Sequence, residues 1–295
     1  MHNVDVFLTL GFGLVTAAIL ALSAVAFTLE YAVTNVANLA HGEILTVGAY
    51  AAYVTHQRTG SAIAAALAAA LAGGLMALAM HAAVVDGFIR RGTPTMVIFI
   101  ATLGLSFVIQ NVLVIVFGAE NVAYTIESGA PARYGPFLWT PIEVEIILSA
   151  AGITALLYFV ISHTKFGKAL RAVSQNRELA RVSGINADAV ASATWFLAGL
   201  VAGYAGFILA ESVGTFSPGF GFSFFLITLT AAVAGGLGRA FGTMVGAIIV
   251  GIALEFFGGY VSAGYNLAFA FAILALVILF RPRGLFVNAR RSVFE

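Results

Sequence analysis

The sequence predicts an all-α polytopic membrane protein with one transmembrane domain over residues 1–295. Of the 295 residues, 61% are hydrophobic and 9% are charged, whereas about 25% are charged in a typical soluble domain. The mean hydropathy of +1.02 agrees with a membrane protein. The 32 glycines, together with many alanines, suit helices that approach closely in lipid.

The expected spans follow from the apolar stretches, because about 20 helical residues cross the hydrocarbon of a bilayer. In order they are residues 6–29, 62–85, 95–118, 146–162, 189–210, 224–237, 242–261 and 267–280. The apolar run 44–55 is too short to cross alone, so the polar stretch before it either belongs to the crossing or re-enters the membrane. Segment 211–223 is expected to be a half-helix or an external elbow. The total is eight or nine transmembrane helices, with re-entrant or half-helices among them.

Charged segments give these spans a single orientation. Segment 163–188 is the most basic part of the chain, and basic loops between apolar spans lie on the cytoplasmic side. The long loop 119–145 has four acids and one base, which places it outside the cytoplasm. Segment 1–5 lacks Lys and Arg, which places the N-terminus outside, and four arginines place the C-terminus inside: Arg281, Arg283, Arg290 and Arg291.

A polar break follows the first span and contains Asn38, His41, Gly42 and Glu43. Ionisable groups at membrane depth are costly, so they mark a functional site by default and make these residues candidates for the solute pathway. The alternative is structural, because such side chains also cap helix ends and tie unwound backbone to neighbouring spans. Glu43 near a helix start also suits the helix dipole. One His and one Glu are too few ligands for a metal site.

A glycine-rich turn at Gly235, Gly236 and Gly238 separates two late apolar runs. Residues 46–49 (TVGA) after the polar break resemble residues 244–247 (MVGA) after this turn. Short interrupted apolar segments at matching places in two halves indicate a central pathway in transporters. The chain is therefore expected to consist of two pseudo-symmetric inverted halves, with the three glycines also in the pathway.

The basic segment 163–188 is predicted to contain a short amphipathic helix. Asn176 can cap it, Glu178 falls in its first turn, and Gly184 can end it. Leu179 and Ala180 are expected on its apolar face. Periodicity alone favours a solvated basic loop that lies on anionic lipid headgroups, and the alternative is a short helix that docks into another protein.

Four motifs occur in order along the chain: Asn38-Leu39-Ala40-His41-Gly42-Glu43; Arg171-Ala172-Val173 with Asn176, Glu178-Leu179-Ala180 and Gly184-Ile185-Asn186; Ala231-Ala232-Val233-x-Gly235-Gly236-x-Gly238; and Arg281-Pro282-x-Gly284-Leu285-Phe286. Together they resemble the branched-chain amino acid ABC permeases of the LivH/LivM family, over residues 10–286. The run 178–184 looks like the loop that docks on the ATPase subunit in ABC importers.

This resemblance implies a permease subunit in a bacterial plasma membrane, with branched-chain or related amino acids as the solute. It also implies a second permease subunit that is a different, related chain, two cytoplasmic ATPases that hold ATP and Mg²⁺, and an extracytoplasmic solute-binding protein. The chain itself is expected to bind no cofactor, and it contains no phosphate-binding loop motif. The residues implied in ATPase coupling are Arg171, Asn176, Arg177, Glu178, Ala180, Arg181 and Gly184.

Three other readings stay open. Relatives of the family also transport urea, short amides and aromatic acids. A proton-coupled secondary transporter would need Glu30, Glu211 or Glu255 in its path, and the roles of these acids and of Arg239 are undetermined by the sequence. A channel or scaffold subunit would need none of them. A net charge of +1 and basic residues confined to loops give no indication of nucleic-acid binding, and the absence of Cys excludes thiol chemistry.

Overall fold

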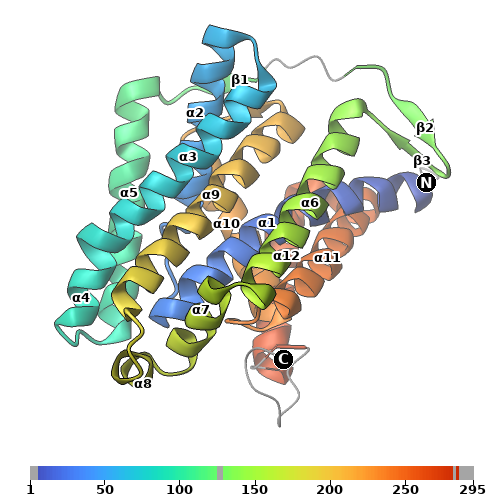
Figure 1. Cartoon of the computed structure of the whole chain (residues 1–295). Helices are drawn as coiled ribbons and strands as arrows, with labels where there is room; N and C mark the ends of the chain where they lie inside the picture. Colours follow the sequence, from blue (N-terminus) through green and yellow to red (C-terminus); the bar gives the residue numbers. More distant parts are fainter. Residues whose placement is uncertain (1–5, 125–128, 282–283, 286–295) are drawn as a thin grey trace.

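Long helices form nearly all of the described chain (Figure 1). The computed structural model describes residues 6–124, 129–281 and 284–285. Segment 1–5, Glu127, Arg283, Arg290 and Arg291, which entered the orientation argument, lie outside the described residues. The main helices are α1 (Val6–Thr34), α2 (His41–Thr59), α3 (Ala62–Met80), α4 (Asp86–Arg90), α5 (Thr95–Phe117), α6 (Pro141–His163), α7 (Lys165–Gln175), α8 (Arg177–Val182), α9 (Ala187–Val213), α10 (Phe220–Gly235), α11 (Ala240–Phe257) and α12 (Asn266–Phe280).

Six helical stretches of the described chain are long and apolar enough to cross a membrane. They are Val6–Thr34, Ala62–Arg90, Thr95–Phe117, Pro141–His163, Ala187–Val213 and Ala240–Phe280. The last of them combines α11, a π-turn (Gly258–Ser262), a 3-10 turn (Ala263–Tyr265) and α12. A polytopic helical membrane protein is thereby confirmed, whereas the expected eight or nine crossings and the inverted halves stay predictions. α10 is apolar but has only 16 residues.

Several helices are longer than their apolar runs predicted. α6 begins at Pro141 instead of residue 146, because the Thr140 side chain accepts a hydrogen bond from the Glu143 backbone N–H and the Glu143 carboxylate accepts one from the Thr140 backbone N–H. This capping box satisfies two free backbone donors. Glu143 and Glu145 therefore belong to α6, and placing them in the loop 119–145 was wrong. α2 begins at His41, so His41, Gly42 and Glu43 form its first turn, and Asn38 precedes it.

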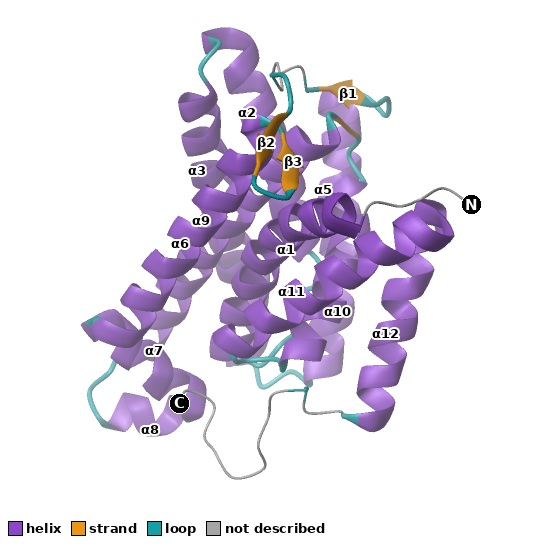
Figure 2. Cartoon of the chain, turned by 90° about the vertical axis from the view of Figure 1, so that its right-hand side faces the viewer, coloured by secondary structure: helices purple, strands orange, loops and turns teal. Residues whose placement is uncertain are grey.

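α1 and α9 are the central helices, and α5 and α6 lie at the edge. In the most apolar stretch of each helix, 67% of the α1 residues and 72% of the α9 residues are buried, against 28% for α5 and 22% for α6. Figure 1 shows α5 standing apart on the left of the bundle, and Figure 2 shows α12 at the right-hand edge of that view. The apolar outer faces of these edge helices suit lipid or a further subunit.

α2, α3 and α9 pack backbone against backbone. A Cβ added to Gly48 of α2 would lie 2.4 Å from the carbonyl oxygen of Gly203 on α9, and one added to Gly73 of α3 would lie 2.5 Å from that of Gly199. Small residues at such crossings let helices meet at the shortest distance. We call these three helices the α2–α3–α9 block, because no flexible side chain separates them at these points.

The two ends of the bundle differ. One end holds α7 and α8 and lies at the bottom of Figure 1; we call it the α8 end. The other, the β end, holds two small antiparallel pairs: β1 (Val122–Ala123) with β4 (Thr215–Phe216), and β2 (Ala132–Tyr134) with β3 (Phe137–Trp139). These pairs fix parts of the predicted loop 119–145. Burial raises the pKa of Tyr124, which follows β1 and packs among aromatic rings.

Candidate functional site

The polar break lies between α1 and α2. Asn35 has a φ of 57°, a left-handed conformation that Asn tolerates better than most residues and that ends α1. The Thr34 hydroxyl donates a hydrogen bond of 2.7 Å to the Glu30 carbonyl oxygen. The chain then turns through residues 35–40 and restarts as α2 at His41. The break is therefore set by local backbone chemistry and places several polar side chains inside the bundle.

Glu30 is the centre of a buried network at this break. Its carboxylate contacts His41 Nδ1 at 2.9 Å through Oε1, and it accepts a hydrogen bond of 2.9 Å from Asn38 Nδ2 through Oε2. The Asn38 side-chain oxygen in turn accepts a bond from the Ala40 backbone N–H. These three side chains are at most 1% exposed. Buried polar groups persist in proteins when they are hydrogen-bonded, as these side chains are here.

Glu43 faces α5 from the same turn of α2. Its Oε1 accepts a hydrogen bond of 2.9 Å from the Ser106 hydroxyl, and the nearby Leu39 backbone N–H donates to Thr102 Oγ1 at 3.1 Å. Ser106 lies midway along α5, so the first turn of α2 lies at mid-height of a spanning helix. The sequence argument missed Thr102 and Ser106. Their signal was a polar residue at every fourth position of an apolar span, continued by Gln110.

Gly42 lets α2 meet α10 directly. A Cβ added to Gly42 would lie 2.6 Å from the Gly221 carbonyl oxygen, and one added to Gly221 would lie 2.2 Å from the Gly42 carbonyl oxygen. The His41 ring packs nearby against Phe27 and Phe225, with ring centroids 5.5 and 5.8 Å apart. The four candidate pathway residues of the break are therefore close together and completely enclosed in the chain.

The three candidate pathway glycines lie elsewhere, in the turn between α10 and α11. Gly236 and Gly238 have φ values of 103° and 83°, which favour glycine, and Gly235 packs against the backbone of Gly242. At about 1.5 Å per helical residue, the turn is about 20 Å along α10 from Gly221. The structure does not bring these glycines together with the break. It brings them to Gly284 and Leu285, whose N–H donates to the Ala234 carbonyl oxygen at 2.8 Å.

Segment 163–188 forms two short helices with side-chain caps. Thr164 caps α7 through a bond from the Gly167 N–H, and Asn176 caps α8 through a bond of 2.9 Å from the Leu179 N–H. Gly184 ends α8 with a φ of 83°, and the Ile185 N–H closes the turn on the Ala180 carbonyl oxygen. The predicted caps of α8 are therefore confirmed. Arg171, another predicted coupling residue, donates from Nη1 to the Ile161 carbonyl oxygen.

One prediction for α8 was wrong. Ala180 is buried with Val173 and Ala187 in a small apolar cluster, but Leu179 is 61% exposed and does not share its face. A six-residue helix makes less than two turns, so a one-residue error in its phase moves a side chain from inside to outside. Val182 is also exposed, at 81%, so α8 presents two apolar side chains on its outer surface.

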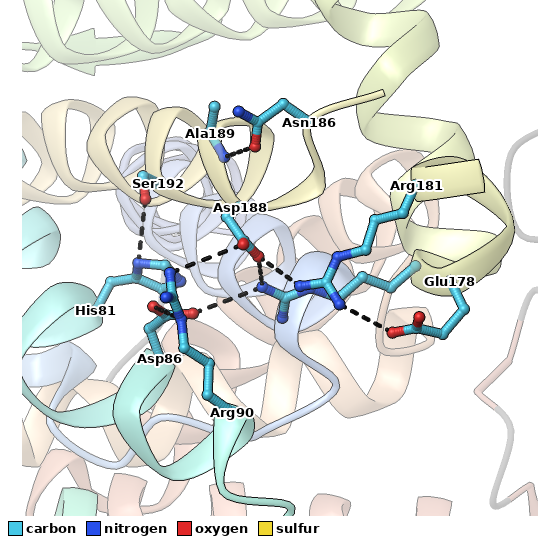
Figure 3. Close-up of polar contacts among 10 residues, drawn as sticks. His81, Asp86, Arg90, Glu178, Arg181, Asn186, Asp188, Ala189 and Ser192 are labelled. Carbon is cyan, nitrogen blue, oxygen red and sulfur yellow. Dashed lines mark hydrogen bonds and ion pairs between the residues drawn. The ribbon is translucent and has the colours of Figure 1, made fainter. Parts of the chain in front are cut away.

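A charge cluster ties α8 to α4 and α9 (Figure 3). Asp188 of α9 accepts hydrogen bonds from Arg177 Nη2 at 2.5 Å and from Arg181 Nη2 at 2.8 Å. Arg177 Nη2 also lies 3.6 Å from Asp86, which pairs with Arg90 at 2.7 Å. Arg181 binds Glu178 at 3.0 Å. The hydrogen bond with Asp188 raises the pKa of Arg181.

Glu211 and Glu255, the other two acids considered for a proton path, have no described contact with the Glu30 network or with the charge cluster. Glu255 of α11 accepts a bond of 2.6 Å from the Thr16 hydroxyl of α1, which gives it a packing partner. Glu211 lies at the β end of α9. Among the described residues no group of three or more His, Cys, Asp or Glu could hold a metal ion.

Apolar spans around a buried polar break define a multi-pass membrane protein. Residues 9–279 match the family described as "Branched-chain amino acid transport system / permease component", and the chain belongs to this family. The resemblance found in the sequence motifs is thereby confirmed: the protein is a transport permease component.

Individual relatives agree with the family match. The chain is 28% identical to the high-affinity branched-chain amino acid transport system permease protein LivH of Escherichia coli, with 90% of each chain covered. It is 28% identical to BraD of Pseudomonas aeruginosa, a permease protein of the same description, with 92% of this chain and 93% of BraD covered. It is also similar to the ribose import permease RbsC of Escherichia coli, at 28% identity over 61% of this chain and 59% of RbsC. No solved structure matches this chain.

Proposed function

We propose that this permease is the membrane subunit of an ATP-driven importer, with a branched-chain or related small amino acid as its solute. The observation that supports this most is the capped helix α8, which stands at the charged end of a family permease and presents Leu179 and Val182 outward. The similarity to the branched-chain amino acid permeases LivH and BraD covers nearly the full length of each of them. The similarity to the ribose permease covers a smaller part of the chain.

The proposed assembly contains three further kinds of subunit. Two cytoplasmic ATPases hold ATP and Mg²⁺, a second related permease completes the pore, and an extracytoplasmic binding protein delivers the solute. The coupling residues on this chain are those of α7 and α8, from Arg171 to Gly184. In this proposal the chain itself binds no cofactor. The polar side chains of the break line the solute path or keep it closed.

The proposed topology follows the basic residues. The α8 end is cytoplasmic, since Lys165, Lys168 and the arginines of α7 and α8 gather there. The N-terminus is outside and the C-terminus inside a bacterial plasma membrane. We further propose eight or nine crossings in two inverted halves, one of which contains α2 and the other α10. The support is that α2 and α10 touch at Gly42 and Gly221.

Alternating access is the proposed mechanism. Movement of α8 by the ATPases would displace the helices that carry the break and the glycine turn, and α5 would separate from α2. The joint between α5 and α2 suits such a movement, because it contains side-chain hydrogen bonds at Ser106 and Thr102 that water or solute can replace. Because the break residues are fully buried, they close the path in this conformation.

Uptake by the assembled complex in proteoliposomes tests this function. Radiolabelled leucine is supplied with the binding protein outside, and ATP or a non-hydrolysable analogue inside. We expect uptake only with ATP and the binding protein. Uptake by the permease alone, driven by an imposed proton gradient, would contradict the proposal and favour a secondary transporter. Competition with unlabelled urea, amides and aromatic acids identifies the solute class.

A further inference from the structure

Arg177 differs from the other charged residues of α8 because it points into the protein. Its side chain is 17% exposed, against 40% for Arg181 and 80% for Glu178. Its Nη2 atom lies between two carboxylates that belong to different helices, 2.5 Å from Asp188 Oδ1 and 3.6 Å from Asp86 Oδ1. A residue that contacted an ATPase directly would face outward. The position of Arg177 instead fits a tie between α8 and the rest of the permease.

The two carboxylates belong to one rigid body. Asp86 begins α4, directly after a π-turn (His81–Val85) that continues α3. His81 in this turn is buried against Trp195 of α9, with ring centroids 5.2 Å apart, and its Nδ1 lies 3.5 Å from the Ser192 hydroxyl. Figure 3 shows His81 and Ser192 beside the charge cluster. Asp86 and Asp188 therefore stand on helices that are packed together just above them.

This body extends to the polar break. Gly203 of α9 meets both Gly48 of α2 and Gly73 of α3 backbone to backbone. A Cβ added to Gly206 of α9 would lie 2.0 Å from the carbonyl oxygen of Leu45, one turn after the first residues of α2. Close-packed interiors transmit a displacement instead of absorbing it. A movement of α9 at the α8 end therefore moves the turn of α2 that carries His41 and Glu43.

We propose that Arg177 is a positioning residue that clamps α8 to Asp86 and Asp188, so that displacement of α8 moves the α2–α3–α9 block as one body. The inference rests on the proposed function, because it requires a partner ATPase to displace α8. It assigns Asp86 and the α4 end to the coupling apparatus, although sequence reasoning used this segment only for orientation. The small apolar cluster of Val173, Ala180 and Ala187 supports the clamp from the other side of α8.

The test compares variants in the complete transporter, purified with its ATPases and reconstituted with the binding protein. The readout is solute taken up per ATP hydrolysed. Partial misfolding lowers uptake and hydrolysis together and leaves this ratio unchanged. For Arg177→Gln we expect the ATPases to stay bound and to hydrolyse ATP, while the ratio falls about tenfold, within the usual range of coupling effects. Arg177→Lys should restore part of the ratio, because it keeps one charge between the carboxylates.

Two matched variants define the control. Lys168→Gln removes an exposed positive charge from the neighbouring helix α7 without touching the clamp, and we expect it to keep the wild-type ratio. Arg181→Gln removes one exposed arm of the cluster and should lower the ratio by about twofold, as for an exposed ion pair. An unchanged ratio in Arg177→Gln, or an equal fall in Lys168→Gln, would overturn the clamp. Absence of ATP-driven uptake in the wild type would instead overturn the proposed function, and the clamp with it.

If the Arg177→Gln permease does not assemble with its ATPases, the distance between the α4 and α8 ends in the otherwise unchanged transporter tests the clamp. The chain has no Cys, so spin labels at Arg91→Cys on the α4 end and Ser183→Cys on the α8 end report only the distance between these segments. In the assembled complex we expect the same distance with and without ATP, because α4 and α8 move together. A distance that changes on ATP binding would show that α8 moves independently of α4, which would overturn the inference.

Discussion

Two polar regions of this permease contain similar chemistry in opposite surroundings. The break network of Glu30, Asn38 and His41 is at most 1% exposed, and the charge cluster around Arg177 and Asp188 lies at the α8 end, where the Asp188 side chain is 36% exposed. Removing one partner from a buried pair leaves an unpaired group in a low dielectric and costs several kcal/mol. Removing one partner from an exposed pair costs little, because water replaces it.

The difference separates two tasks. Breaking the hydrogen bonds of the break costs much free energy, because its groups are buried, so we expect these groups to hold one conformation. We expect the charge cluster to contribute little to stability and to act through its geometry, because it joins α8 to α4 and α9. If this comparison is right, mutations at the break should lower stability, and mutations in the cluster should lower coupling instead.

The largest expected effect is at Glu30. Glu30→Ala leaves Asn38 Nδ2 and His41 Nδ1 without their carboxylate partner in a closed interior. We expect a loss of about 3–5 kcal/mol in the free energy of unfolding, as for a broken buried pair. Thermal and denaturant unfolding of the purified permease in detergent would measure it. Glu120→Ala, at an exposed acid of the β end, is the control and should change stability by less than about 0.5 kcal/mol; equal losses would contradict the comparison.

The next effect concerns the packing between the two regions. Gly48→Ala places a methyl group 2.4 Å from the Gly203 carbonyl oxygen, so α2 and α9 must separate. We expect a loss of about 1–3 kcal/mol, typical of overpacking, together with a lower uptake per ATP. Gly152→Ala is the matched control, because a Cβ at this α6 position meets nothing within 4 Å. It should gain up to about 1 kcal/mol from helix propensity.

A smaller effect is expected where the break meets α5. Ser106→Ala removes the hydrogen bond of 2.9 Å from the Ser106 hydroxyl to Glu43 Oε1. The expected loss is about 1–3 kcal/mol, the range for leaving a buried acceptor unsatisfied. Ser106→Thr keeps the hydroxyl and serves as the control. If Ser106→Ala were as stable as the wild type, this hydrogen bond would not hold α2 against α5, and the account of the α2–α5 joint would be wrong.

The smallest stability effect is expected at Asp188. Asp188→Asn removes the charge that binds Arg177 and Arg181, yet the Asp188 side chain is 36% exposed and water can replace part of these bonds, so the loss should stay below about 1 kcal/mol. Most of this contribution should vanish in about 1 M salt, where the screening length is about 3 Å. Unfolding midpoints at low and high salt would measure it. A salt-independent loss comparable to that of Glu30→Ala would remove the contrast between the two regions.

The sequence predicted the class and the caps better than the contacts. The spans could be predicted because hydropathy depends only on local composition. The caps of α8 could be predicted because Asn176 and Gly184 act within their own helix. Glu30 could not be assigned, because its partners depend on the turn at Asn35. Ser106 and Arg177 depend on which helix face meets which neighbour. Leu179 was misplaced for the same reason, since a short helix does not define its own phase.

The central claim is that α2, α3 and α9 move as one body when α8 is displaced, while α5 separates from them. Two spin-label pairs in the Cys-free chain test it directly in the assembled transporter. One pair joins the β end of α2 to the α4 end (Arg58→Cys with Arg91→Cys), and the other joins α2 to the end of α5 (Arg58→Cys with Glu120→Cys). The account predicts that ATP leaves the first distance unchanged and alters the second. A change in the first distance, or none in the second, would contradict it.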